Sequence, residues 1–335
     1  ALQPWVTMAQ DVEKYHDLVN RAELYITENN EEKALMLYQE AFKERFGHFS
    51  KDYYNALLCA IQMKADALCI EYTQALAKRG VPVTFFNQAH LQYAGSVKNI
   101  SALYEEISTG IDKNLVDTLK LMILEDQQYR GDNLAQEGSI NTIDELNYTR
   151  VVRILKEYGY PSEQLTGTNM MRNGRRIGTR NDFDVILTHQ LKNGHCELME
   201  YLEHSLRSGS LNPEVFVTHA TYCFDEEQRL GCFNKNQVVY FQIDSLIFTC
   251  DSPNETSVNK TRKQYYLCSL DDLKKKIHFA FDKTREQPYS LHCNYSITYR
   301  ELNGNDLDKN VQELKKENPG IHLFKALKSK EPYFW

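Results

Sequence analysis

The chain contains no run of about 18 consecutive apolar residues, so the sequence predicts no transmembrane span. It also lacks an excess of basic residues, because the formal net charge is −7 over 335 residues. An acidic balance disfavours a broad phosphate-binding surface, and we therefore predict no nucleic-acid partner. The glycine patterns of a P-loop, a Rossmann fold and a Gly-x-Ser-x-Gly elbow are absent as well. We predict no cofactor.

The chain has eight cysteines but no C-x-x-C pair. They are Cys59, Cys69, Cys196, Cys223, Cys232, Cys250, Cys268 and Cys293. This spacing fits no zinc site, so we predict no metal ligands, and a disulfide framework is not expected in so long a chain. We interpret most of the cysteines as buried thiols, which favours a reducing compartment such as the cytoplasm. The start at Ala1 without methionine also fits a removed signal peptide and a periplasmic or surface location.

Residues 11–80 contain a repeat with a period of 34 residues. Ala22 recurs as Ala56, and Tyr38 recurs as Tyr72. Small residues at these spacings allow antiparallel helices to approach closely. The pattern resembles the tetratricopeptide repeat, although Asp52 stands where that family usually has tryptophan. The resemblance implies helical hairpins with a concave surface, so we expect a protein or peptide partner to bind residues 11–110.

The rest of the chain divides into a helical part and a mixed part. Apolar residues at helical spacing predict a helix over residues 113–136, a polar loop at 137–142, and further helices up to residue 207. After residue 233, β-branched and aromatic runs predict strands at 238–250, 264–268 and 291–300. The predicted fold is mostly α, with helical-hairpin repeats in 1–112, a helical central domain in 113–233, and an α+β portion in 234–335.

Polar residues recur on the central helices at spacings that place them on common faces. Asp126 and Arg130 are four residues apart, and Asp144 and Asn147 are three apart, so each pair shares one helix face. His189 lies in an otherwise apolar stretch. These five residues are our candidate catalytic set.

The order of these elements resembles a bacterial domain family of unknown function. That family has Asp-x-x-x-Arg, Asp-x-x-Asn, Tyr-Gly-x-Pro, a histidine, and Gln-x-Tyr-Gly-Thr in this order. The counterparts here include Tyr158 in the turn and Gln228 with Gly231 in the last element, whose tyrosine and threonine are replaced by Leu230 and Cys232. The resemblance covers about 110 residues and carries no established activity. We expect Gln228, Gly231 and Tyr158, together with the repeat tyrosines Tyr38 and Tyr72, to contribute to binding.

Two classes of function remain open from the sequence. The first is a protein-binding scaffold that uses the helical repeats. The second is a hydrolase with His189 as general base, Asp126 or Asp144 orienting its ring, and Arg130 holding an anionic group. Variants of the second would use a metal ion on His189 and one of these carboxylates, or a nucleophilic Cys232 or Cys196 beside His189 or His219. The enzyme hypothesis predicts that the candidate residues converge.

Overall fold

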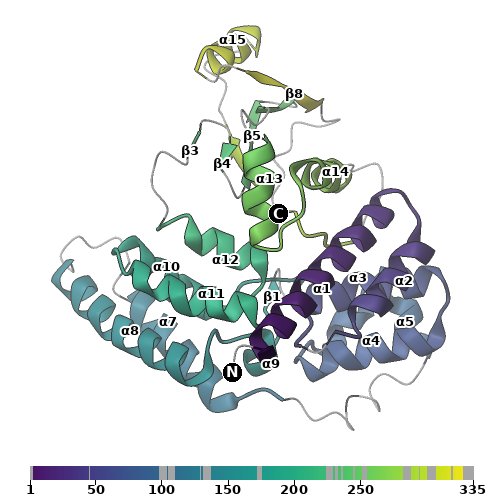
Figure 1. The fold of residues 1–335 in the computed structure, drawn as a ribbon, viewed down its shortest axis with the longest axis horizontal. Coiled ribbons are helices and arrows are strands. Elements are labelled where there is room, and N and C mark those ends of the chain that lie inside the picture. Colours follow the sequence, from purple (N-terminus) through teal and green to yellow (C-terminus); the bar gives the residue numbers. More distant parts are fainter. Residues whose placement is uncertain are drawn as a thin grey trace. The chain divides into compact units, whose positions relative to one another are not determined.

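The computed structural model divides the chain into two compact units (Figure 1). The first combines Ala1–Cys223 with His278–His292, and the second combines Phe224–Ile277 with Cys293–Trp335. The repeat region and the central helices therefore share one unit, where the sequence predicted separate parts. The structure describes residues 3–44, 46–97, 104, 110–128, 130, 137–171, 176–223, 229–230, 233–234, 237–243, 246–250, 255–281, 288–293, 295–299, 307–317 and 320–326.

The repeat region folds as two helical hairpins. The first pairs α1 (Gln3–Thr27) with α2 (Glu31–Ala41), and the second pairs α3 (Ser50–Gln62) with α4 (Asp66–Lys78). Ala22 and Ala56 are completely buried, so these small residues allow close helix approach. The 3₁₀ turns Val83–Asn87 (η1) and Ala89–Leu91 (η2) and the short helix α5 (Gln92–Val97) follow. Assignment to the tetratricopeptide family stays a prediction.

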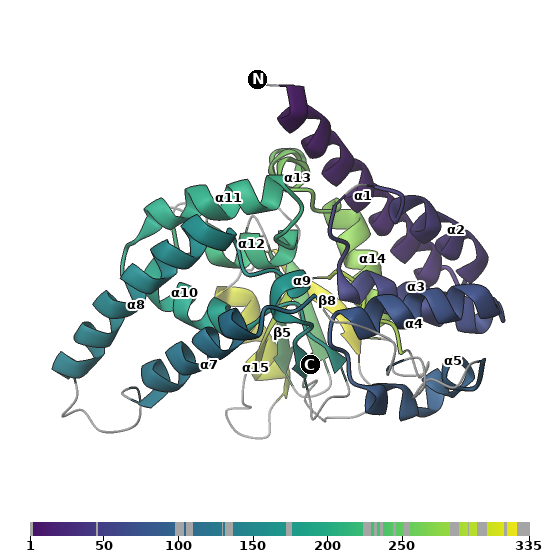
Figure 2. The same cartoon turned by 90° about the horizontal axis from the view of Figure 1, so that it is seen from below.

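Three long helices form the framework of the central region. They are α7 (Lys113–Gln128), α8 (Glu137–Tyr158) and α10 (Asp182–Lys192), and each packs against the other two (Figure 2). The predicted loop at 137–142 is wrong, because α8 begins at Glu137. Ile140 and Ile143 lie at helical spacing with Asn147, so one continuous packed face outweighs the local turn preference of the polar residues.

Smaller elements complete the first unit. The helix α9 (Glu163–Thr166) follows α8, whose end is marked by Gly159 in the left-handed region at φ 70°. The strands β1 (Met170–Met171) and β2 (Arg176–Ile177) form an antiparallel pair. After α10 come the 3₁₀ turn η4 (Cys196–Leu198) and the helices α11 (Met199–Arg207) and α12 (Pro213–Ala220).

The second unit contains a sheet with the strand order β3-β4-β5-β6-β8. Its strands are β3 (Arg229–Leu230), β4 (Phe233–Asn234), β5 (Gln237–Ile243), β6 (Leu246–Cys250), β7 (Tyr295–Tyr299) and β8 (Ile321–Ala326). Strand β7 pairs with β5 in parallel, whereas β6 pairs with β5 and β8 in antiparallel fashion. The helix α15 (Leu307–Glu317) packs on β5 and β8.

Two more helices, α13 (Glu255–Gln264) and α14 (Leu270–Ala280), precede β7. The predicted strand at 264–268 is wrong, because α13 ends there in a turn with Tyr266 at φ 58°. The aromatic residues of 264–268 favoured a strand, but in the structure they lie in the turn that ends α13. The prediction of a mostly α protein with a C-terminal α+β portion is confirmed. Among the described helices, none combines the length and apolar character that crossing a bilayer requires.

Candidate functional site

The packing of α7, α8 and α10 brings the five candidate catalytic residues together. Asp126 lies in the last turn of α7 and Arg130 follows it, Asp144 and Asn147 lie on α8, and His189 lies on α10. The apolar faces of these helices are buried beside them. They include Leu119, Met122, Val151, Ile154, Ile186 and Leu187. The polar cluster therefore sits on a packed helical framework.

Asp126 is the centre of this cluster, and its side chain is completely buried. Arg130 donates to both of its oxygens, from Nε at 2.9 Å and from Nη2 at 3.1 Å. His189 Nδ1 lies 3.2 Å from Oδ1, Gln127 donates to Oδ2 at 2.7 Å, and Asn147 donates to Oδ1 at 3.4 Å. Burial by itself would raise the pKa of Asp126, but the hydrogen bonds from His189 and Arg130 hold that pKa well below its usual range.

Arg130 joins the two carboxylates of the cluster. Its Nη2 also donates to Asp144 Oδ1, and Asn193 Nδ2 donates to the other oxygen of Asp144 at 3.0 Å. Burial lowers the pKa of Arg130, but the bonds to Asp126 and Asp144 outweigh it and raise that pKa. The guanidinium is thus committed to fixing the carboxylates. The hypothesis that Arg130 also holds a substrate anion stays a prediction.

His189 presents its second ring nitrogen to the exterior. Its Nδ1 faces the buried carboxylate of Asp126, and about 20% of its side chain is exposed. Within the described part of the chain, Nε2 has no hydrogen-bond partner. This is the arrangement of a carboxylate-oriented imidazole, in which the carboxylate fixes the tautomer and leaves Nε2 able to accept a proton.

The same residues include a set with the chemistry of a metal site. Asp126, Asp144 and His189 offer ligand atoms that all lie within 4.8 Å of one another. A divalent ion would have to compete with Arg130, whose positive charge already pairs with both carboxylates. The donor set therefore suits a metal ion only if Arg130 moves away, and the prediction of no metal stays a prediction.

A second polar cluster, which the sequence did not reveal, ties residues 288–292 to the helical hairpins. His292 Nε2 lies 2.7 Å from Asp52 Oδ1, and Nδ1 lies 3.1 Å from Glu214 Oε2. Its backbone N–H donates to Glu23 at 2.7 Å, and Lys51 Nζ donates to Glu214 at 3.2 Å. Both ring nitrogens of His292 contact carboxylates, one on α3 and one on α12. Partners 240 residues apart form no local motif that could have predicted this cluster.

The same segment occupies the face that α1 and α3 present. Asn55 on α3 donates to Ser290 O at 2.8 Å and accepts from Ser290 N at 2.8 Å. Tyr54 donates to Pro288 O at 2.8 Å. A peptide partner could reach this face only by displacing the chain's own segment, and this counts against the scaffold hypothesis in its original form.

Of the residues that we expected to contribute to binding, the structure describes Tyr38, Tyr72 and Tyr158, and none of these three forms a hydrogen bond with the Asp126 cluster. Tyr38 and Tyr72 are buried, so they are core residues and cannot contact a partner, which corrects the prediction for both. Tyr158 is 37% exposed at the end of α8. Gln228 and Gly231 lie outside the described residues. The repeated tyrosines reflect packing between hairpins, which the sequence pattern alone does not distinguish from recognition.

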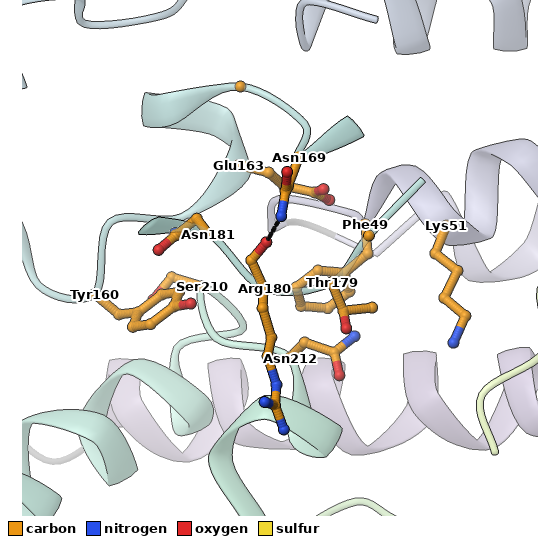
Figure 3. Close-up of a pocket in the computed structure, with 12 residues that line it drawn as sticks. Phe49, Lys51, Tyr160, Glu163, Asn169, Thr179, Arg180, Asn181, Ser210 and Asn212 are labelled. Carbon is orange, nitrogen blue, oxygen red and sulfur yellow. Dashed lines mark hydrogen bonds between the residues drawn. The ribbon is translucent and has the colours of Figure 1, made fainter. Parts of the chain in front are cut away.

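A third polar group includes Tyr160, which lines a pocket in the first unit (Figure 3). Tyr160 donates to Asp184 Oδ1 at 2.9 Å, and His219 Nε2 lies 2.7 Å from the same oxygen. All three side chains are buried. His219 is therefore enclosed, and a role as base for a nucleophilic cysteine is not supported by its position.

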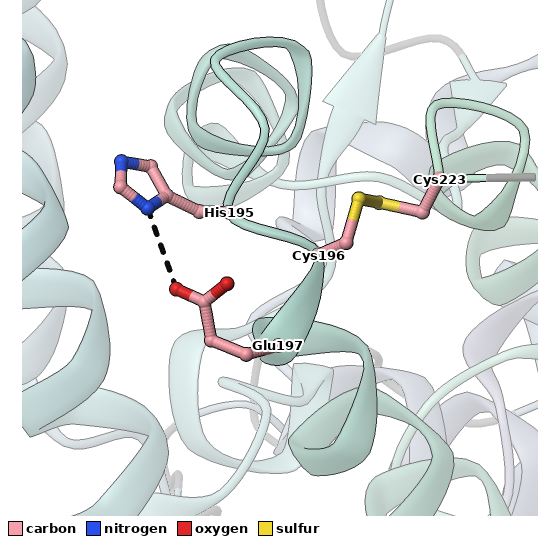
Figure 4. The surroundings of a disulfide bond; sticks show 4 residues. All are labelled: His195, Cys196, Glu197 and Cys223. Carbon is pink, nitrogen blue, oxygen red and sulfur yellow. Dashed lines mark ion pairs between the residues drawn. A yellow bond between two sulfur atoms is a disulfide. The ribbon is translucent and has the colours of Figure 1, made fainter.

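Cys196 is also unsuited to nucleophilic attack, because it forms a disulfide with Cys223 (Figure 4). Their Cα atoms are 5.6 Å apart. This bond corrects the interpretation of these two cysteines as thiols and removes part of the argument for a reducing compartment. Cys59 and Cys69 are buried free thiols, as expected. Cys232 lies outside the described residues.

The chain was also compared with protein-family models, curated proteins and solved structures, and none of the three comparisons gave a match.

Proposed function

We propose that the chain is a hydrolase in which His189 is the general base and Asp126 orients it. The observation that carries the proposal is the contact between His189 Nδ1 and a fully buried carboxylate at 3.1–3.2 Å, combined with a partly exposed ring. A histidine that served packing alone would have no need of a buried carboxylate held by Arg130.

The geometry assigns a distinct task to each group. Asp126 accepts from Nδ1, so the neutral ring carries its proton there and offers a lone pair at Nε2. Nε2 accepts a proton from a water molecule, and that water attacks an electrophilic substrate atom. Asp126 then stabilises the imidazolium, which returns the proton to the leaving group. Arg130 and Asn147 are positioning residues, since both hold Asp126.

Hydrolysis is favoured over other proton-transfer chemistry because the His189 ring is partly exposed and its Nε2 has no hydrogen-bond partner among the described residues. Water is the nucleophile that reaches such a nitrogen without a dedicated channel. The order of motifs around Asp126, Arg130, Asp144, Asn147 and His189 supports one shared site, because these positions come from α7 and the residues after it, from α8 and from α10, yet meet in one place.

The proposal is tested by hydrolysis of chromogenic carboxylic and phosphoric esters across pH 5–9. We expect His189→Gln to lower kcat/KM by about 10²–10⁴-fold. Asp126→Asn should cause a comparable loss, because an asparagine amide donates to Nδ1 and shifts the ring proton to Nε2. The matched control is His195→Gln, since His195 is a half-exposed histidine paired with Glu197 at 3.3 Å. If the wild type does not turn over these esters, or if His189→Gln behaves like His195→Gln, the proposal fails.

Protein binding through residues 11–110 is our second proposal, and the tetratricopeptide-like hairpins support it. It requires residues 288–292 to exchange with an external peptide of similar character. A labelled synthetic peptide with the sequence of residues 287–293 tests this requirement. Saturable binding that Asn55→Ala abolishes would support exchange, whereas no binding would reject this mode.

A further inference from the structure

A small pocket in the first unit lies away from the His189 site and has an unusual lining. Its volume is about 30 Å³, and the residues around it are mostly polar. Lys51 comes from the start of α3, Glu163 from α9, Arg180 from the segment before α10, and Asn212 from the residue before α12. Figure 3 shows the Arg180 side chain extending along the pocket, with Asn212 and Thr179 on one side of it and Tyr160 and Ser210 on the other.

Asn212 supplies a hydrogen-bond donor that has no partner. Its side chain is only 4% exposed. Oδ1 accepts from Glu214 N at 2.8 Å and thereby caps α12, and this bond fixes which end of the amide carries the hydrogens. Nδ2 makes no hydrogen bond with any described group. Buried donors are almost always satisfied, so an unsatisfied one that lines a pocket indicates an acceptor supplied from outside.

Arg180 supplies a charge that is also uncompensated. Its guanidinium forms no ion pair or hydrogen bond within the described residues, although its backbone oxygen accepts from Asn169 Nδ2. Lys51, the other cation of the pocket, is neutralised by Glu214 at 3.2 Å. An arginine fork matches the two oxygens of a carboxylate, and this favours an oxyanion over a neutral ligand.

The remaining charges limit the anion to a single negative charge. Glu163 lies in the same lining, and burial raises the pKa of this carboxyl to about 7. At neutral pH the lining therefore has one unpaired cation and one partly ionised acid. A dianion such as sulfate would be repelled by Glu163 and would exceed the available positive charge.

We propose that this pocket binds a small monocarboxylate, with Arg180 holding the carboxylate and Asn212 Nδ2 donating to one of its oxygens. This ligand site is independent of the hydrolase proposal, because it shares no residue with the Asp126–His189 pair.

The experiment is a titration of the full chain, followed by ¹⁵N NMR of the asparagine side-chain amides and the arginine Nε–H groups. The probes are sodium acetate, sodium chloride and sodium sulfate at constant ionic strength and pH 7. We expect acetate to give saturable shifts at Asn212 and Arg180 at millimolar concentration, because so small a ligand has few atoms that can contribute. Chloride and sulfate should give no saturable shift at these two groups.

Two variants and two matched controls give the result its specificity. Asn212→Asp keeps the oxygen that caps α12 but replaces the free donor with an acceptor, and Arg180→Gln removes an exposed charge without disturbing packing. Each should weaken acetate binding at least tenfold. Asn30→Asp makes the same change at the N-cap of α2, and Arg207→Gln removes a partly buried arginine that pairs with Glu203 on α11, so neither should alter binding.

Three results would overturn the proposal. One is the absence of saturable shifts with acetate. Another is binding of chloride or sulfate at least as tight as that of acetate, which would mean an unspecific anion site. The third is unchanged acetate affinity in Arg180→Gln, a variant whose exposed position leaves little reason for misfolding.

Discussion

Replacement of Asn55 by alanine should release the segment 288–292 from the helical hairpins. Asn55 is completely buried on α3, and its amide makes two hydrogen bonds of 2.8 Å with the backbone of Ser290. Alanine removes both and leaves the N–H and C=O of Ser290 without protein partners. Ser290 itself is half-buried, so water can reach these groups in part.

The expected loss follows from the two bonds. Each contributes a net value of about 1 kcal/mol, and incomplete hydration of Ser290 adds to this, so the free energy of unfolding should fall by about 2–3 kcal/mol. Urea denaturation measures this value. Hydrogen exchange of the Ser290 amide should accelerate by about 30- to 150-fold, since the local opening energy falls by the same amount.

The control is Asn114→Ala, an exposed asparagine on α7 whose loss should change stability by no more than about 0.5 kcal/mol. If Asn55→Ala matches this control in both urea stability and Ser290 exchange, the segment is not held as the structure shows. The segment 288–292 would then not occupy the face of the helical hairpins.

Three further results are expected from urea denaturation. Burial and the charge of Lys51 lower the pKa of His292, but Asp52, Glu23 and Glu214 outweigh them and raise this pKa to about 10. The protonated ring therefore stabilises the fold fully below pH 6.5, and this stabilisation is lost as the pH rises through 10. The His292→Gln variant should not lose stability over this pH range. Burial raises the pKa of Glu163 from 4.5 to about 7. The free energy of unfolding of the wild type should therefore fall as the pH rises from 4.5 to 7, and that of Glu163→Gln should fall much less. Reduction by dithiothreitol opens the loop of 27 residues between Cys196 and Cys223, and it should lower the free energy of unfolding of the wild type by about 3.5 kcal/mol. The stability of Cys196→Ser should not change on reduction.

The composition of the candidate site followed from local spacing. Asp144 and Asn147 share a face of α8, and Asp126 and Arg130 are four residues apart at the end of α7, so the spacing predicted both pairs before their neighbours were known. The role of Arg130 could not be predicted from this spacing. Only the packing of α7 against α8 shows that it lies between two carboxylates. The contribution of Asn193 to Asp144 likewise depends on where α10 ends.

The sequence by itself determined the elements whose pattern repeats over several turns. These are the hairpin helices of residues 11–80, the apolar faces of α7 and α10, and the change to strands after residue 233, because apolar periodicity directly reflects which side of an element is buried. Prediction from the sequence failed at two places. Polar residues at 137–142 favoured a loop where α8 begins, and aromatic residues at 264–268 favoured a strand where α13 ends.

Tertiary structure alone decided the contacts between distant segments. His292 meets Asp52 and Glu214, Cys196 meets Cys223, and Arg180 and Asn212 line one pocket. Such contacts depend on how helices pack and where the chain returns, and no short-range pattern encodes them. Asp52 shows the difference: it breaks the repeat pattern at the usual tryptophan position, and only the folded chain supplies the histidine that gives its buried charge a partner.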